Sequence, residues 1–208
     1  MITLDLRKEL KGLYQPSAKA VQVVEVPRFK FLMIDGEIEP GHGPGDSPSF
    51  AVAMQAMYGL AYTLKFSSKK RAENPIDYPV MPLEGLWWTD SGEYDLTHPE
   101  GWKYTLLIYQ PEHISAEMLE AAREQVGKKR PSAALGEVRL GEFEEGRCIQ
   151  IMHIGPYSEE MRTIAVMDAF AAGHDYRMRG KHHEIYLSDP RRARPEKMKT
   201  VLRHPVEG

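Results

Sequence analysis

The segment RCIQIMHIGPY, residues 147–157, is an apolar run typical of a buried strand, and it ends at a proline that can open a helix. The segment FLMIDGE, residues 31–37, takes the same place before an earlier helical pattern. Two more pairs follow in the same order, namely EGLWWTD (84–90) with HEIYLSD (183–189) and YTLLIYQP (104–111) with MKTVLRHPV (198–206). Three pairs in one order indicate that a strand–helix–strand–strand module occurs twice.

Helix caps and apolar spacing predict one long helix in each half. Ser47 followed by Pro48 is a helix start, and this helix is expected to run to about Phe66. In the second half Pro156 opens a helix that ends at Gly173. The expected buried faces are Phe50, Met54, Met57, Ala61 and Leu64 in the first helix, and Met161, Ile164, Met167 and Phe170 in the second.

The predicted fold class is α+β, with a duplicated strand–helix–strand–strand (SHS2-type) module that forms an antiparallel sheet, two long helices and a central groove. Residues 1–20 are polar and are expected to form an N-terminal arm rather than a core element. Residues 21–208 are expected to form a single domain of two repeats, about 21–111 and 133–206, joined by a linking helix at about 115–129. The groove between the repeats is the predicted ligand site, because such interfaces often bind ligands.

The composition excludes several classes of protein. Of the 208 residues, 42% are apolar and 27% are charged, which is typical of a globular chain. The 27 basic and 30 acidic residues give a net charge of -3 without a basic stripe, so no nucleic-acid partner is expected. No apolar run approaches the ~20 residues that span a bilayer, so no membrane partner is expected. With no signal-peptide core and Cys148 as its single cysteine, the chain is expected to be cytoplasmic and without an internal disulfide.

Glu184 is the most informative single residue. It lies inside a strand pattern whose neighbours, Ile185 to Leu187, suit a packed sheet. Burying a carboxylate is costly, so such a group is normally paired or has a raised pKa. Glu184 therefore either lies at a solvated strand edge, or pairs with an arginine such as Arg162, or lies at the floor of the groove as a cation partner or general base.

Aromatic residues favour the groove interpretation. Tyr58 and Tyr62 are one helical turn apart, and Trp87, Trp88, Trp102 and Tyr104 come from the strands that border the first half of the sheet. Matching Thr89-Asp90 with Ser188-Asp189 places Trp87 in phase with Tyr186 and Glu184. Such a set predicts a flat apolar pocket for planar aromatic ligands. The candidate ligand-binding residues are Tyr58, Tyr62, Trp87, Trp88, Trp102, His153, His182 and Tyr186.

A metal site is the alternative use of the acidic strand. His182, His183 and Glu184 are adjacent, but neighbouring side chains on a strand point to opposite faces, so the two histidines cannot bind one ion. His182 and Glu184 share a face, and His153 is the one further candidate ligand, whereas zinc needs at least three. A metal-dependent hydrolase with these three ligands stays a minor alternative, and the main interpretation uses no metal or other cofactor.

Six segments carry a resemblance to a known family. VPRFKFLMIDGEIEPG, MYGLAYTLKF, PLEGLWW, EGRCIQIMHIGPYSEE, HHEIYLSDPRR and KTVLRHPV together resemble the stand-alone GyrI-like small-molecule-binding proteins. The similarity extends from about Val21 to Val206, and the His-Ile-Gly-Pro-Tyr and His-Glu-Ile-Tyr-Leu segments are its most specific parts. The resemblance implies the duplicated fold with a central groove.

The resemblance also implies functions. Related domains are drug sensors in some transcription regulators, with a strand glutamate at the base of the drug pocket, and Glu184 falls on that position. This chain has no helix-turn-helix segment, so direct gene regulation is not expected. Some stand-alone members are hydrolases that open the cyclopropane of DNA-alkylating cyclopropanoids, and the chain looks most similar to that branch.

Hydrolysis of a strained cyclopropane needs a base that acts on water and a donor at the carbonyl oxygen. The expected catalytic residues are Glu184, with a pKa raised by its aromatic surroundings, and Tyr157, with Tyr62 as the alternative tyrosine. The rival function is binding without chemistry, either to sequester a drug or to dock on a partner protein as the gyrase-inhibitory relatives do. An exposed strand edge would also permit a homodimer.

Overall fold

One large sheet carries the fold of the protein, which a computed structural model describes over residues 1–90 and 101–208. Its strands are β2 (Gln22–Val26), β3 (Phe29–Glu37), β5 (Leu83–Trp88), β6 (Lys103–Gln110), β7 (Arg139–Phe143), β8 (Gly146–Ile154), β9 (Arg177–Met178), β10 (His182–Tyr186) and β11 (Lys199–Glu207). Their order in space is β2-β8-β11-β10-β5-β6-β3-β7, with β9 paired to β11, and every pairing is antiparallel. The predicted α+β class with a large antiparallel sheet is confirmed.

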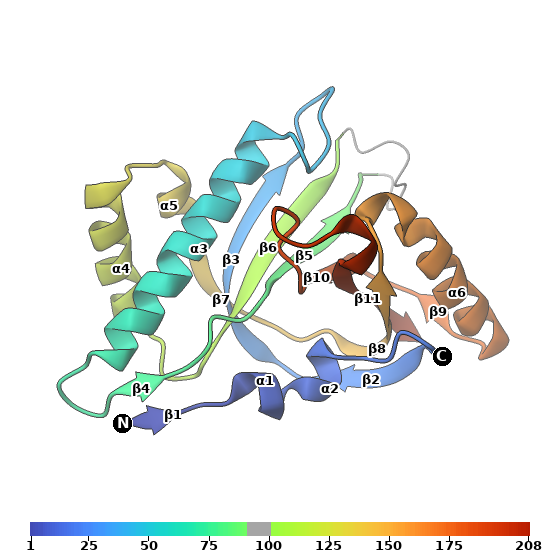
Figure 1. Ribbon diagram of the computed structural model, residues 1–208, viewed down its shortest axis with the longest axis horizontal. Coiled ribbons are helices and arrows are strands. Elements are labelled where there is room, and N and C mark those ends of the chain that lie inside the picture. The colour runs from blue at the N-terminus through green and yellow to red at the C-terminus, as the bar shows by residue number, and fades with distance from the viewer. Residues whose placement is uncertain (91–100) are drawn as a thin grey trace.

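The two long helices are α3 (Pro48–Lys69) and α6 (Glu160–Gly173), and each packs on its own half of the sheet (Figure 1). A third helix, α4 (Ala116–Lys129), packs against α3 and joins the halves. The remaining elements are α1 (Leu6–Glu9), α2 (Lys11–Tyr14), α5 (Ala134–Glu137), two short 3-10 turns, and the strands β1 (Ile2–Thr3) and β4 (Ile76–Asp77), which pair in parallel. No helix in the described ranges has both the length and the apolarity needed to cross a bilayer.

Helix α3 begins where the sequence predicted. The Ser47 hydroxyl accepts a hydrogen bond from the Phe50 backbone N–H at 3.2 Å and donates one to the Glu39 carboxylate, while Pro48 occupies the first turn. The helix ends about one turn beyond Phe66. Four members of the expected apolar face are buried, namely Phe50, Met57, Ala61 and Leu64, and Met54 is half-buried.

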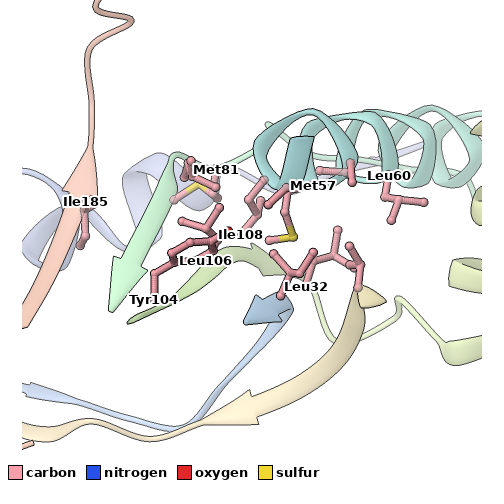
Figure 2. Close-up of a cluster of buried hydrophobic side chains, with 14 of the residues drawn as sticks. Leu32, Met57, Leu60, Met81, Tyr104, Leu106, Ile108 and Ile185 are labelled. Atoms are coloured by element: carbon pink, nitrogen blue, oxygen red, sulfur yellow. The ribbon is translucent and has the colours of Figure 1, made fainter. Parts of the chain in front are cut away.

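This buried face of α3 closes the main hydrophobic core. Figure 2 shows Met57 and Leu60 of the helix above Leu32, Leu106 and Ile108 of the sheet. All five side chains are fully buried. The first half of the sheet is therefore a rigid support for β10, the neighbouring strand at the centre of the sheet.

The sheet order is symmetric about the β10–β5 pair. The first half contributes β5, β6 and β3, and the second half contributes β10, β11 and β8 in the same relation. The edge strands cross over, because β2 pairs with β8 and β7 pairs with β3. Each half thus completes the other's sheet. The element order agrees with the predicted duplication. That the two halves arose by duplication of one module stays a prediction.

The N-terminal segment corrects one expectation. Leu6 and Tyr14 are buried in the main core, and the Tyr14 hydroxyl donates a hydrogen bond to Glu84 Oε1 at 2.5 Å. The prediction of an arm outside the core is wrong for these two side chains. Leu6, Leu10, Leu13 and Tyr14 have the spacing of an apolar helical face, so the sequence carried a signal for packing against the sheet that the arm prediction did not use.

Candidate functional site

The two faces of β10 have different neighbours. His182, Glu184 and Tyr186 lie on one face, and Glu184 is opposite Gly85 of β5 and Leu202 of β11. This face carries both long helices, because α3 packs on Trp87 through Phe50 and α6 packs on Leu202 through Met167. Glu184 therefore lies in the middle of the sheet on its helical side. The predicted phase of Trp87 with Glu184 and Tyr186 is confirmed by the strand register.

Glu184 is buried, with 6% of its surface exposed. Its Oε1 lies 3.5 Å from Nε2 of His182. Burial, the charge of Glu184 and a hydrogen bond to Glu184 raise the pKa of Tyr186 well above its usual range. The alternative of a solvated strand edge is therefore wrong, and Arg162 pairs with Glu159 at 3.2 Å.

A second carboxyl group, Glu160, lies beside Glu184 and was missed in the sequence. Glu160 is the first residue of α6, is 1% exposed, and its Oε1 has no hydrogen-bond partner among the described residues. Burial and the charge of Glu184 raise the pKa of Glu160 to about 10. At neutral pH the site thus holds a protonated carboxyl group next to Glu184, an arrangement that can supply both an acid and a base. Glu160 was missed because a glutamate at a helix start normally lies in a solvated first turn. The sequence signal that could have placed it in the site is its position three residues after the candidate catalytic residue Tyr157.

Two tyrosines complete the surroundings, Tyr157 from the 3-10 turn just before α6 and Tyr58 from α3. Burial and then the charges of Glu184 and Glu160 raise the pKa of Tyr157, whose ring meets Tyr186 edge-on with 5.9 Å between centroids. Tyr58 of α3 lies near enough to Tyr157 to contribute to the rise in the pKa of Tyr157. Tyr62 lies one turn further along α3, half exposed, with its ring 6.4 Å from that of Tyr58. Of the two candidate tyrosines, Tyr157 is thus the one shown to be close to Glu184.

The predicted tryptophans separate into different places. The Trp87 indole N–H donates to the Tyr186 hydroxyl at 2.8 Å. Trp102 packs behind Trp87, with 5.5 Å between ring centroids, and both rings are buried. Trp88 points to the opposite face of the sheet, where Nζ of Lys181 lies 3.2 Å from its ring centroid. Trp87 therefore has a direct contact with the residues around Glu184.

The third candidate metal ligand, His153, is held by other groups, although the charge of Glu184 acts on it. Its Nδ1 is 2.8 Å from the Thr163 hydroxyl and its Nε2 is 3.2 Å from the Pro156 carbonyl oxygen. Burial lowers the pKa of His153. In the part of the chain that the structure describes, no three His, Cys, Asp or Glu side chains are arranged to hold a metal ion. The hypothetical site of His153, His182 and Glu184 thus lacks its third ligand.

The connection between β10 and β11 lies over the same region. In Figure 1 this dark red segment runs between α3 and α6. The charges of Asp189 and Arg191 act on Tyr58, and that of Asp189 also acts on Tyr157. Asp189 and Arg191 form an ion pair of 2.9 Å. The connection thus places Asp189 near both tyrosines.

Comparison with known proteins gives the family of the chain. Residues 19–207 match the GyrI-like small molecule binding domain. The chain belongs to the GyrI-like family. No curated protein sequence matches it. The resemblance stated from the sequence is thus confirmed.

Solved structures of Listeria innocua proteins are similar to this GyrI-like protein over the whole chain. One is an uncharacterized conserved protein with 42% identity and a TM-score of 0.88, covering 98% of this chain and 100% of its own. Another is described as a hydrolase, with 40% identity, a TM-score of 0.82 and the same coverage. The EcmrR C-terminal domain shares the fold at 11% identity, with a TM-score of 0.57 and coverage of 94% and 98%.

Gly85 allows the contact between Trp87 and Tyr186 in this GyrI-like protein. A Cβ at position 85 would lie 2.7 Å from Trp87 Nε1 and 3.0 Å from the Tyr186 hydroxyl. We expect Gly85→Ala to separate these groups and to lower the free energy of unfolding by about 1–3 kcal/mol. Chemical denaturation measures the change. Gly12→Ala is the control, because a Cβ there meets nothing within 4 Å; equal effects of the two substitutions would contradict the prediction.

Glu160→Gln should stabilise the protein in alkaline solution. The pKa of Glu160 is about 10 in the folded protein and 4.5 in the unfolded chain. Between these pH values the folded protein keeps a proton on Glu160 that the unfolded chain has lost. Stability then decreases as the pH rises from about 4.5 towards 10, and glutamine removes this dependence. We expect Glu160→Gln to gain about 2–4 kcal/mol at about pH 8 and little at about pH 4. Thermal unfolding at the two pH values measures it, and a gain that does not depend on pH would contradict the assigned pKa.

Proposed function

We propose that this GyrI-like protein binds a planar electrophilic aromatic compound beside Glu184 and adds water to it. The observation that carries the proposal is the buried Glu184 next to a protonated Glu160, beneath Tyr157. A buried carboxyl group that keeps its proton beside a second carboxyl group suits proton transfer at neutral pH. The description of two Listeria innocua relatives at about 40% identity as hydrolases supports hydrolysis.

The substrate class that we propose is a cyclopropane fused to a cyclohexadienone. Glu184 takes a proton from water while the water oxygen forms a bond to a cyclopropane carbon. The strained carbon–carbon bond breaks, and its electron pair moves into the ring to give a phenolate. The phenolate oxygen then takes a proton from solvent and Glu184 returns its proton to solvent, so the sum of the reaction is the addition of one water molecule. No cofactor takes part in this balance.

The other side chains have roles that follow from their contacts. The Tyr157 hydroxyl is the proposed hydrogen-bond donor to the carbonyl oxygen, because the charges of both Glu184 and Glu160 act on this tyrosine of the 3-10 turn before α6. Tyr186 is held by the Trp87 N–H and by Glu184, so it fixes the direction of the carboxylate. Tyr58 provides an aromatic surface from the opposite helix.

The test is incubation with a cyclopropanoid alkylating agent, followed by mass spectrometry. The proposal expects the substrate mass to increase by one water, and by one heavy-oxygen water when the buffer contains oxygen-18. Buffer alone and heat-denatured protein are the controls. Turnover no faster than the controls would reject the hydrolase.

The rival is a protein that binds such compounds without reaction. The family's description as a small-molecule binding domain favours it equally well. In that case the compound would be recovered unchanged, while its reaction with added DNA would slow in proportion to the protein present. The same incubation therefore separates the two functions.

A further inference from the structure

A cavity lies beneath α6. Its volume is about 180 Å³, and it is lined mainly by Met161, Ile164, Met167, Met178, His182 and His204. Met167 is 2% exposed and forms the base of the cavity, whereas Met161 is 48% exposed and lies towards solvent. The cavity therefore has an apolar interior and an open side.

The size and lining indicate the class of ligand. A designed apolar cavity of about 150 Å³ binds benzene, so a space of this volume accepts one aromatic ring or a small fused pair. Methionine side chains are flexible and polarizable, and they make favourable contacts with aromatic rings of different shapes. Three methionines and one isoleucine around one space thus favour an uncharged aromatic group.

The polar groups of the cavity are two histidines and one aspartate. The rings of His182 and His204 lie 5.9 Å apart, and burial together with His182 lowers the pKa of His204 to about 4. His204 is thus neutral at physiological pH and can form one hydrogen bond with an N–H or O–H group on a ring. Asp168 is the acidic residue of the lining, and it disfavours an anionic ligand.

His182 connects this cavity to the site described above. The same imidazole lines the cavity and has its Nε2 3.5 Å from Glu184 Oε1. We propose that the cavity under α6 is a second binding compartment, which takes an uncharged aromatic ring of the size of benzene or indole. The cavity could hold an aromatic ring attached to the cyclopropanoid substrate, and this part of the proposal rests on the function proposed above. Binding of a free aromatic ring in the cavity does not depend on that function.

The experiment uses indole as the probe and the methyl groups of methionine as reporters. Indole is titrated into the full chain labelled with carbon-13 at the methionine methyls. The methyl signals of Met161, Met167 and Met178 are expected to shift together, while those of Met54 and Met118, which lie on α3 and α4, stay in place. Signals of the three cavity methionines that do not move at millimolar indole would overturn the proposal.

A pair of variants tests the position. Ile164→Trp fills the cavity from a half-buried position and is expected to weaken indole binding at least tenfold. Val166→Trp adds the same side chain to the same helix at a position that is 50% exposed, and is expected to leave binding unchanged. Equal binding by both variants would overturn the proposal. Addition of water to a cyclopropanoid without an attached ring should persist in Ile164→Trp, so loss of indole binding and loss of hydrolysis are separate results.

Discussion

Glu184→Gln is expected to abolish the addition of water to a cyclopropanoid while the affinity for the compound changes by less than about tenfold (~1.4 kcal/mol). A general base typically contributes about 10²–10⁴-fold to a rate, and glutamine has the same shape but cannot take the proton. The side chain keeps one oxygen that can accept the hydrogen bond of Tyr186, so the local packing is retained. Turnover by mass spectrometry and affinity by calorimetry measure the two effects separately.

The matched control for this substitution is Glu159→Gln. Glu159 is next to Glu160 but has a half-exposed side chain and pairs with Arg162 at the surface, so its loss should leave turnover unchanged. If Glu184→Gln turned over substrate at the normal rate, Glu184 would have no part in the chemistry. If it lost binding as well as turnover, its role would be to hold the ligand.

Glu145→Gln is expected to lower the free energy of unfolding by about 3–5 kcal/mol, because it breaks a buried ionic network. On the face of the sheet opposite to Glu184, His183 lies between two carboxylates, with Nδ1 3.0 Å from Glu145 and Nε2 3.0 Å from Glu84. Arg203 reaches Glu145 at 3.4 Å. All four side chains are buried, with between 1% and 3% of their surface exposed. A charge left without its partner therefore cannot be solvated by water.

Glu144→Gln is the control for the network. Glu144 is the preceding residue and pairs with Arg28 at 3.2 Å, with more than half of each side chain exposed. Its replacement should change stability by less than about 0.5 kcal/mol. Urea denaturation of both variants measures the difference. A loss below about 1 kcal/mol for Glu145→Gln would show that the network contributes little to stability.

The same network predicts how stability depends on pH. Burial alone would lower the pKa of His183, but Glu145 and the hydrogen bonds to Glu145 and Glu84 raise it from 6.5 to about 9, so its contribution is lost as the pH rises through that range. Burial alone would raise the pKa of Glu145, yet His183 and Arg203 lower it from 4.5 to about 2, and its contribution is lost on acidification. The network is therefore fully stabilising between about pH 4.5 and 6.5.

Much of the fold was predictable because local rules decided it. The cap at Ser47 and the apolar spacing to Leu64 predicted α3, and the Gly-Pro break after β8 predicted the start of the α6 region. The exchange of β2 and β7 between the halves was not predictable. A strand pattern shows which residues alternate, but it does not show which edge accepts the strand.

The candidate site was predictable only in part for a similar reason. The register of β10 with β5 bore out the phase of Trp87, Tyr186 and Glu184. Trp88 follows the same alternation to the opposite face, although composition alone grouped it with Trp87. The burial of Glu160 beside Glu184 could not be predicted, because the environment of a helix start is set by the strands on which the helix packs.

The sequence by itself determined the family, the α+β class, the two long helices and the strand that carries Glu184, because caps and apolar periods act over a few residues. Only the tertiary structure decided that Glu160 would share the site of Glu184, that His183 would be enclosed by Glu84 and Glu145, and that a cavity would open beneath α6. These features depend on distances between segments far apart in the chain, and a carboxyl group takes its pKa from the charges and the burial around it rather than from its neighbours in sequence.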